Sequence, residues 1–283
     1  MISYVSCDAV EDDLIHRAFS VGFSDYLVNM NFSEGEFIQR FFGPEGNKRE
    51  FSHLALDKGR PVGLILGGMK EYEGINTLRC GTLCVDPDYR RAGVAQSLFD
   101  LHQSIGVQQG CQQLFLEVIT GNEKAIRFYE KQGYEKRYDL HLYVLEDGLQ
   151  IAFTNPLSSE ISPIGLEQIQ KIRYEIDVHL NWQNDIEFLE QSKHQYHYGL
   201  FAKQQVVGVL SINDSGRISF LWVDRSYRQK GMAAYLLNFA VRELNLQKLS
   251  TSFPNHGNLE GFYKRMGFRR ATISQLEMYK MLP

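Results

Sequence analysis

The chain lacks the usual signals of a secreted, membrane-bound or nucleic-acid-binding protein. Its 283 residues include only four cysteines, and no two form a Cys-x-x-Cys pair, so neither a zinc ribbon nor a thiol-redox motif is indicated. No apolar run approaches the roughly 20 residues that span a bilayer, and the N-terminus lacks the regions of a signal peptide. The net charge of −4 argues against a nucleic-acid surface, which is normally basic. We expect a cytoplasmic protein that binds neither nucleic acid nor membrane.

Metal-ligand and dinucleotide motifs are also missing. His194 and His197 lie close in sequence, but no carboxylate or third imidazole completes a ligand spacing, so we expect no metal site. The sequence has no G-x-G-x-x-G fingerprint and no Walker G-K-[ST] loop. An anion site of either familiar type is therefore not expected.

A different anion-binding pattern is present in residues 83–95. Leu83 and Val85 point to one face of an expected strand and Cys84 to the other, and Pro87 ends the strand. A helix follows, and the small residues Gly93 and Ala95 at its start let an anionic group approach the backbone amides. The pattern predicts a phosphate or pyrophosphate site. An ordinary strand–helix connection with glycine at its turn is the alternative.

The same stretch occurs twice. Residues 221–233 repeat the loop, and the pattern Phe-Tyr-[Glu/Lys]-[Lys/Arg]-x-Gly-[Tyr/Phe] occurs at 128–134 and again at 262–268. Two matched motifs in the same order indicate two tandem domains, and the chain length agrees with that number. We place the halves at 1–147 and 148–283, with the junction near 146–150.

The loop sequence Arg-x-x-Gly-x-Ala, following Val-Asp-Pro, resembles the acetyl-CoA loop of the GNAT N-acetyltransferase superfamily, and the resemblance covers nearly the whole chain. It implies a mixed α/β (α+β) fold with two GNAT-like domains, each a central, mostly antiparallel twisted sheet flanked by helices. It also implies acetyl-CoA as co-substrate and an acetyl transfer to an amine by direct attack. The expected acceptor is a small-molecule amine or a peptide N-terminus, and the expected assembly is a monomer or homodimer.

The resemblance also implies the residues that contact acetyl-CoA. The loop would hold the pyrophosphate, the strand edge would give backbone bonds to the pantetheine arm, and Asn122 would bond an amide of that arm. A plain helix N-cap is the other interpretation of Asn122, and the two roles are compatible. The residues expected to bind the cofactor are Cys84, Val85, Arg90, Arg91, Ala92, Gly93, Val94, Ala95, Asn122 and Ala125.

Two residues are expected to catalyse the transfer. Tyr129 matches the tyrosine that lies beside the thioester sulfur in many GNAT enzymes, and it would protonate the departing thiolate. Glu117 precedes it by twelve residues, an arrangement similar to the bacterial enzymes that acetylate ribosomal-protein N-termini, and it would act as base through water. The alternatives are a tyrosine packed on the sheet and a surface glutamate.

The second half departs from this pattern. Thr251 occupies the position that corresponds to Glu117, and His256 and Leu259 replace Asn122 and Ala125, although the loop itself is intact. We therefore expect the first half to be catalytic and the second to be degenerate. Two alternatives stay open: both domains are non-catalytic acyl-CoA-binding or sensing modules, or the transferred acyl group is longer than acetyl.

One stretch of the sequence indicates where the acceptor would bind. Residues 9–31 have helical spacing with an aromatic stripe, and GNAT-like domains use this region for acceptor recognition, so residues 19–26 are the predicted acceptor contacts. A helix that packs its stripe on the sheet is the favoured alternative, since such stripes usually face a core.

Overall fold

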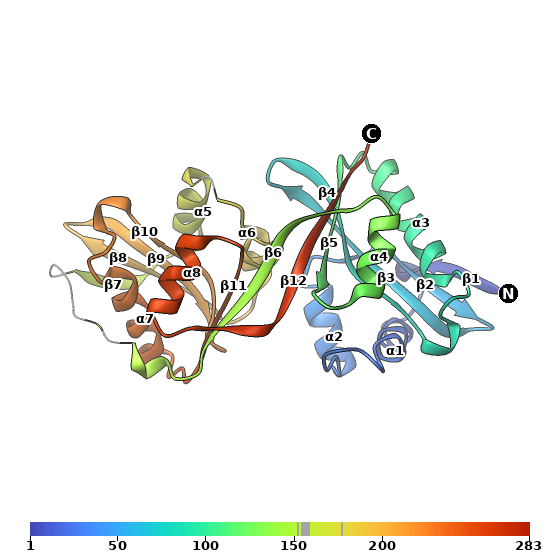
Figure 1. The fold of residues 1–283 in the computed structure, drawn as a ribbon, viewed down its shortest axis with the longest axis horizontal. Coiled ribbons are helices and arrows are strands. Elements are labelled where there is room, and N and C mark those ends of the chain that lie inside the picture. The colour runs from blue at the N-terminus through green and yellow to red at the C-terminus, as the bar shows by residue number, and fades with distance from the viewer. Residues whose placement is uncertain (152, 154–158, 177) are drawn as a thin grey trace. The chain divides into compact units, whose positions relative to one another are not determined.

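The structure is a computed structural model that describes residues 1–151, 153, 159–176 and 178–283. It divides into two compact units. The first consists of Met1–Arg137 together with Leu276–Pro283, and the second of Tyr138–Gln275. The helices and strands of both units are labelled in Figure 1.

The first unit is built on a mostly antiparallel sheet with the strand order β1-β2-β3-β4-β5-β12. The pairs from β1 to β4 are antiparallel, whereas β4 and β5 are parallel because α3 crosses over between them. The strands are β1 (Ile2–Ser6), β2 (Lys48–Asp57), β3 (Arg60–Tyr72), β4 (Ile75–Val85), β5 (Gln113–Ile119) and the end of β12 (Arg269–Met281).

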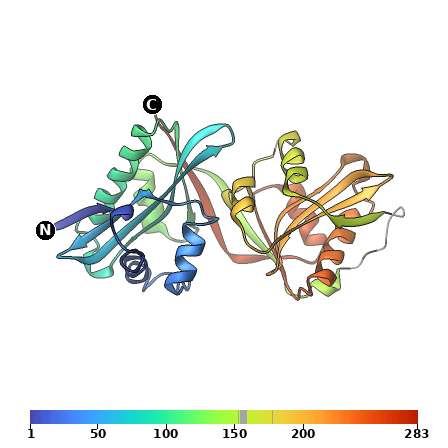
Figure 2. The same cartoon turned by 180° about the vertical axis from the view of Figure 1, so that it is seen from behind.

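Helices cover both faces of this sheet (Figures 1 and 2). On one face, α1 (Asp12–Gly22) and α2 (Glu34–Phe41) bury a phenylalanine-rich core. On the other face, α3 (Val94–Gln108) and α4 (Glu123–Lys131) pack on a core of aliphatic and tyrosine side chains. A capping box fixes the start of α2, because the side chains of Ser33 and Glu36 each accept the other residue's backbone amide.

The second unit has the matching strand order β6-β11-β10-β9-β8-β7. Its pairs are antiparallel except β10 with β11, which corresponds to the parallel pair of the first unit. The strands are β6 (Glu135–Leu145), β7 (Glu160–Pro163), β8 (Gln195–Ala202), β9 (Gln205–Asn213), β10 (Arg217–Val223) and β11 (Leu249–Pro254). The helices are α5 (Leu166–Glu175), α6 (Ile186–Gln191), α7 (Met232–Glu243) and α8 (Gly257–Arg265).

Short 3-10 turns join several of these elements in both units. They are η1 (Cys7–Ala9), η2 (Pro87–Tyr89), η3 (Gly148–Gln150), η4 (Trp182–Asn184) and η5 (Arg225–Tyr227).

The units exchange their closing strands. β6 begins in the first unit but belongs to the second from Tyr138 onward, where it pairs with β11. β12 begins in the second unit, and its last residues, from Leu276, belong to the first. The spatial units are therefore discontinuous in sequence, unlike the halves 1–147 and 148–283. That boundary remains our proposal for where one sequence repeat ends and the next begins.

Both units carry the same irregularity in the strand that leads to the loop. The register of β4 against β3 shifts at Gly81, and the register of β10 against β9 shifts at Ser219. Each shift is an extra residue in one strand, which bends that strand. The predicted repeat is thus present in the backbone as well as in the sequence.

One predicted element is shorter than the pattern indicated. The helix expected over 9–31 is α1, which ends at Gly22 with a cap at Phe23. The favoured interpretation of its aromatic stripe is confirmed for Phe19, which is fully buried against Phe37 and Phe41. No helix within the described residues is long and apolar enough to cross a membrane.

Candidate active site

The loop between β4 and α3 has a backbone that only a few residue types adopt easily. Asp86 begins it by accepting the amide of Asp88 with Oδ1 at 3.0 Å, which forms the turn η2. Arg91 then takes a φ of 66° and Gly93 a φ of 82°, both in the left-handed region. Gly93 is the N-cap of α3. Glycine suits this position because it has no Cβ to oppose a positive φ.

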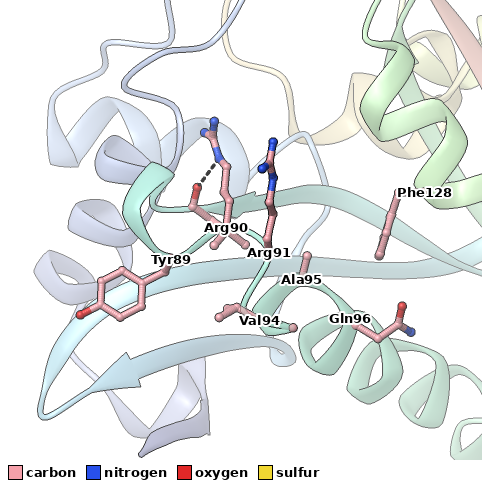
Figure 3. Close-up of a pocket in the computed structure, with 9 residues that line it drawn as sticks. Tyr89, Arg90, Arg91, Val94, Ala95, Gln96 and Phe128 are labelled. Carbon is pink, nitrogen blue, oxygen red and sulfur yellow. Dashed lines mark hydrogen bonds between the residues drawn. The ribbon is translucent and has the colours of Figure 1, made fainter.

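The start of α3 offers backbone amides to a ligand. The amide of Ser97 is bonded to the carbonyl of Gly93 at 3.0 Å, whereas the amides of the three preceding residues have no intrahelical acceptor. A cavity of about 260 Å³ opens here, lined by the loop and by Phe128 of α4 (Figure 3). Amides at a helix N-terminus favour an anion, so this part of the structure fits a phosphate or pyrophosphate group.

The Arg90 side chain is committed to the protein. Its Nε donates to the carbonyl of Val85 at 3.1 Å (Figure 3). Its two terminal nitrogens donate to the carboxylate of Asp25 at 2.7 and 2.6 Å. Arg90 therefore fastens the loop to the strand end and to the segment after α1. The Arg91 side chain is exposed and extends from the loop on the same side as Arg90.

Strands β4 and β5 separate beside the cavity. They are paired from Thr77 and Gln113 to Cys80 and Leu116, and β4 then continues to Val85, still paired with β3 but no longer with β5. As predicted, Cys84 and Val85 point to opposite faces: Cys84 packs with α1, and Val85 with the core under α3. On the side of β5, the end of β4 offers backbone groups to a ligand.

Tyr129 lies in α4, close to this separation. Its ring is buried against Phe99 and Phe128, with centroids 5.7 and 5.4 Å away. Burial raises the pKa of the phenol well above its ordinary value, and the nearby Cys80 thiol adds to the effect. The residue keeps its proton at every working pH. This is the protonation state that a proton donor must have.

Glu117 is not at the surface. Its side chain is only 2% exposed, and its Oε2 accepts from Nη2 of Arg79 at 2.7 Å. Nη1 of Arg79 donates to the Glu45 carboxylate at 2.9 Å and to the Glu45 carbonyl at 3.1 Å. Burial raises the pKa of Glu117, the guanidinium of Arg79 opposes this, and the carboxylates of Glu277 and Glu45 add to the rise. The surface interpretation of Glu117 is wrong.

Asn122 and Ala125 meet at the start of α4. The Asn122 side chain accepts the backbone amide of Ala125 at 3.3 Å, so the N-cap interpretation is confirmed. The phenol of Tyr26, from the segment after α1, lies near the Asn122 side chain, and burial raises its pKa. Whether Asn122 contacts the pantetheine arm as well stays a prediction.

Arg79 was not predicted from sequence as a residue of this site. Asp25 and Tyr26 lie in the stretch predicted to contact the acceptor, but nothing in the sequence linked Asp25 to Arg90 or Tyr26 to Asn122. Arg79 had a readable signal, because an arginine inside an otherwise apolar strand pattern must find a buried anion. The acceptor prediction over 19–26 combines residues of two kinds: Phe19 is core, whereas Asp25 and Tyr26 border the site.

The second unit repeats the loop closely. Asp224 accepts the amide of Ser226 at 2.8 Å, Gln229 has a φ of 62°, and Gly231 caps α7 with a φ of 79°. Nε of Arg228 donates to the carbonyl of Val223 at 3.0 Å, as Arg90 does in the first unit. The backbone conformation of the loop is thus the same in both units.

The surroundings of the motif tyrosine differ in the second unit. The ring of Tyr263 stacks on Phe253 with centroids 5.4 Å apart, and Phe253 stacks on Tyr143 of β6 at 4.9 Å. Burial raises the pKa of Tyr263 to about 12, and the nearby Thr251 hydroxyl opposes this rise. The position that corresponds to Glu117 thus holds a hydroxyl instead of a carboxylate.

Fold and loop define an acyl-CoA-dependent transferase of the GNAT type, and the family models agree. The acetyltransferase (GNAT) family matches residues 13–134, and a second acetyltransferase (GNAT) domain matches residues 162–278. The chain belongs to the GNAT acetyltransferase family and carries two tandem domains of it. Members of this family use acetyl-CoA.

Individual relatives make the comparison more specific. N-alpha-acetyltransferase 30 of Schizosaccharomyces pombe is 30% identical over 123 residues, which are 42% of this chain and 80% of the relative. N-alpha-acetyltransferase 60 of Xenopus tropicalis is also 30% identical over 128 residues, which are 38% of this chain and 53% of the relative. For the second relative, the match spans about half of its length.

Solved structures match the complete chain in fold. A tandem GNAT protein from the clavulanic acid biosynthesis pathway has a TM-score of 0.75 at 14% identity, with 99% of this chain and 98% of that chain covered. A GCN5-related N-acetyltransferase from Sphaerobacter thermophilus has a TM-score of 0.69 at 12% identity, with 99% and 95% covered. At such identities the likeness concerns the fold alone.

Proposed function

We propose that the first unit transfers an acetyl group from acetyl-CoA to a primary amine, by direct attack in a ternary complex. The observation that carries the proposal is that Tyr129, buried near the separation of β4 and β5, directly follows Phe128, which lines the cavity at the start of α3. A candidate anion site, a strand edge and a candidate proton donor in one unit support the proposal.

The binding roles follow the geometry of the loop. The amides of Gly93, Val94 and Ala95 would hold the pyrophosphate, and the end of β4 would hydrogen-bond the pantetheine arm through its backbone. When bound, acetyl-CoA supplies the thioester carbonyl that the amine attacks. Arg90 keeps the loop in shape by its bonds to Val85 and Asp25, and Arg91 adds positive charge at the surface.

Proton transfer completes the reaction. The amine nitrogen bonds to the carbonyl carbon, the carbon–sulfur bond breaks, and the nitrogen loses one proton while the sulfur gains one. Tyr129 donates the proton to the leaving sulfur. The raised pKa of Tyr129 would make this proton transfer unfavourable in water. In the buried site, however, the pKa of the departing thiol is raised as well. General acid help of this kind contributes typically about 100- to 10,000-fold.

The proton of the amine needs a relay. Because Glu117 is buried in an ion pair with Arg79, it takes the proton through ordered water and not by contact with the acceptor. Its raised pKa makes it a stronger base than an exposed glutamate. A base with a pKa closer to neutrality is better matched to a reaction run at neutral pH.

For the acceptor, a peptide N-terminus is favoured over other small amines, because two relatives are named as N-alpha-acetyltransferases. Asp25 and Tyr26 border the site on the acceptor side and are candidates to contact it.

The test measures CoASH release with a thiol reagent for peptides with varied N-termini, polyamines and aminoglycosides. Turnover of one class, lost in Tyr129→Phe, supports the proposal. The absence of turnover with all of them, despite tight acetyl-CoA binding by calorimetry, would support a non-catalytic acyl-CoA-binding or sensing protein. The confinement of Glu117 in its ion pair favours that second function. The same panel with propionyl-CoA and longer acyl-CoA tests the alternative that the transferred acyl group is longer than acetyl.

A further inference from the structure

The buried carboxylate of Glu117 has a close neighbour from the far end of the chain. Glu277 lies in β12, has no exposed surface, and belongs to the first unit although it follows the entire second domain in sequence. Its Oε2 accepts a hydrogen bond from the phenol of Tyr279 at 3.1 Å.

Two contacts fix how β12 lies against β5. The amide of Leu282 donates to the carbonyl of Gln112 at 2.9 Å, and the rings of Tyr279 and Phe115 are 4.9 Å apart. Three residues forward from Gln112 and three back from Leu282 lead to this ring pair, which is the progression of an antiparallel ladder. Two further steps bring Glu117 opposite Glu277.

The alternation of faces gives the same answer. Leu116 and Val118 of β5 belong to the core under α3 and α4, and so do Leu276 and Met278 of β12. Glu117 and Glu277 alternate with these residues and therefore share the other face of the sheet. Directly opposed residues of an antiparallel pair have their Cβ atoms about 4.5–5.5 Å apart.

We propose that Glu277 is a positioning residue for Glu117: its carboxyl group, opposed to that of Glu117 across β12 and β5, favours the protonated form of Glu117 in the first unit. The second domain's closing strand would thereby complete the base of the first domain. This inference deepens the proposed function and rests on it for its kinetic part.

The physical reason is charge. A carboxyl group opposed to a second one in a buried site ionises at extra cost, because like charges repel. The repulsion of Glu277 is one of the causes that raise the pKa of Glu117. The charged and titratable groups around the pair include Arg79 of β4, Glu45 after α2, Tyr72 and Glu73 at the end of β3, and Tyr279 of β12.

The first experiment compares pH profiles of kcat/KM. Glu277→Gln is expected to move the acid limb to lower pH by about one unit, since a pair counts as interacting when its coupling exceeds about one unit. Glu277→Asp keeps the charge and should restore most of the parental limb. Glu135→Gln, at an exposed site with 76% of its side chain accessible, is the control and should change nothing. An unmoved limb in folded Glu277→Gln would overturn the inference.

The second experiment needs no acceptor and so separates this inference from the proposed function. Because the folded pKa of Glu117 is raised, its contribution to stability is present at low pH and lost as pH rises through that pKa. The free energy of unfolding of the parent, measured relative to that of Glu277→Gln, should therefore fall as pH rises through the folded pKa of Glu117. A difference between the two proteins that does not change with pH would reject the role of Glu277 even if turnover were found. If Glu277→Gln does not fold, Tyr279→Phe should give a smaller change in the same direction.

Discussion

Asp25 holds both terminal nitrogens of Arg90, at 2.6 and 2.7 Å, although Arg90 begins the motif expected to bind pyrophosphate. The hydrogen bond from Arg90 lowers the pKa of the Asp25 carboxyl and outweighs the smaller, opposite effect of desolvation. The pair therefore stays charged at neutral pH. An anion at this loop therefore relies first on the backbone amides, and the conformation of the loop matters more than the charge of Arg90.

Gly93→Val should weaken acetyl-CoA binding about tenfold or more. Nothing lies within 4 Å of an added Cβ, so the loss comes from the strain of a branched residue at a φ of 82°, which costs about 1–3 kcal/mol, and from obstruction of the amides. Calorimetric titration measures it.

Gly231→Val is the matched control, because it imposes the same strain at a φ of 79° in the second unit. It should leave the affinity of the first site unchanged. If Gly231→Val weakened acetyl-CoA binding and Gly93→Val did not, the acetyl-CoA site used in turnover would belong to the second unit.

Tyr129→Phe should lower kcat by about 100-fold or more with little change in acetyl-CoA affinity, because only a proton donor is removed. Tyr263→Phe should stay within about threefold, below the tenfold that 1.4 kcal/mol of barrier represents. Circular dichroism first shows that both variants fold. Steady-state kinetics of both variants with the same acceptor then show which unit catalyses the transfer. The reverse order of effects would make the second unit the enzyme.

Arg79→Met should destabilise the first unit by about 3–5 kcal/mol, since it leaves buried carboxylates without their cation. Adding Glu117→Gln should recover part of that loss, because one of the stranded charges is gone. Urea unfolding of the single and double variants gives the coupling energy. Strictly additive losses would contradict a functional ion pair between these residues.

His102 should make the protein sensitive to acid. It is fully buried in α3, and burial lowers its pKa to about 3. The folded state thus excludes a proton that the unfolded chain binds below its ordinary pKa of 6.5, so stability falls as pH drops through that window. From pH 7 to pH 5 the parent should lose about 2 kcal/mol more than His102→Met. His194→Met, at an exposed site, should behave like the parent.

Much of the fold was readable because local signals were strong. The loop, its helix and the Phe-Tyr motif recur in both halves, and the opposite orientations of Cys84 and Val85 follow from simple alternation. Glu117 was identified, but its environment was not. Its partner Arg79 comes from β4 and also binds Glu45 from the loop after α2, and its neighbour Glu277 lies 160 residues away, so no spacing rule connects them.

The exchange of closing strands could not be predicted for a related reason. A strand pattern shows which face of a residue is buried, but not which sheet edge the strand joins. β6 and β12 would each satisfy the same alternation in either unit. Only the pairing of β6 with β11 and the bond from Leu282 to Gln112 distinguish the two arrangements.

This exchange also sets the order of events on the ribosome. β5 of the first unit already pairs with β4, but it receives its second neighbour, β12, only when Leu276–Met281 have been made, after all of Tyr138–Gln275. At 5–20 residues per second, that interval lasts about 7 to 28 seconds. Throughout it the nascent first unit presents an unpaired strand edge, a surface prone to aggregation that chaperones would have to shield.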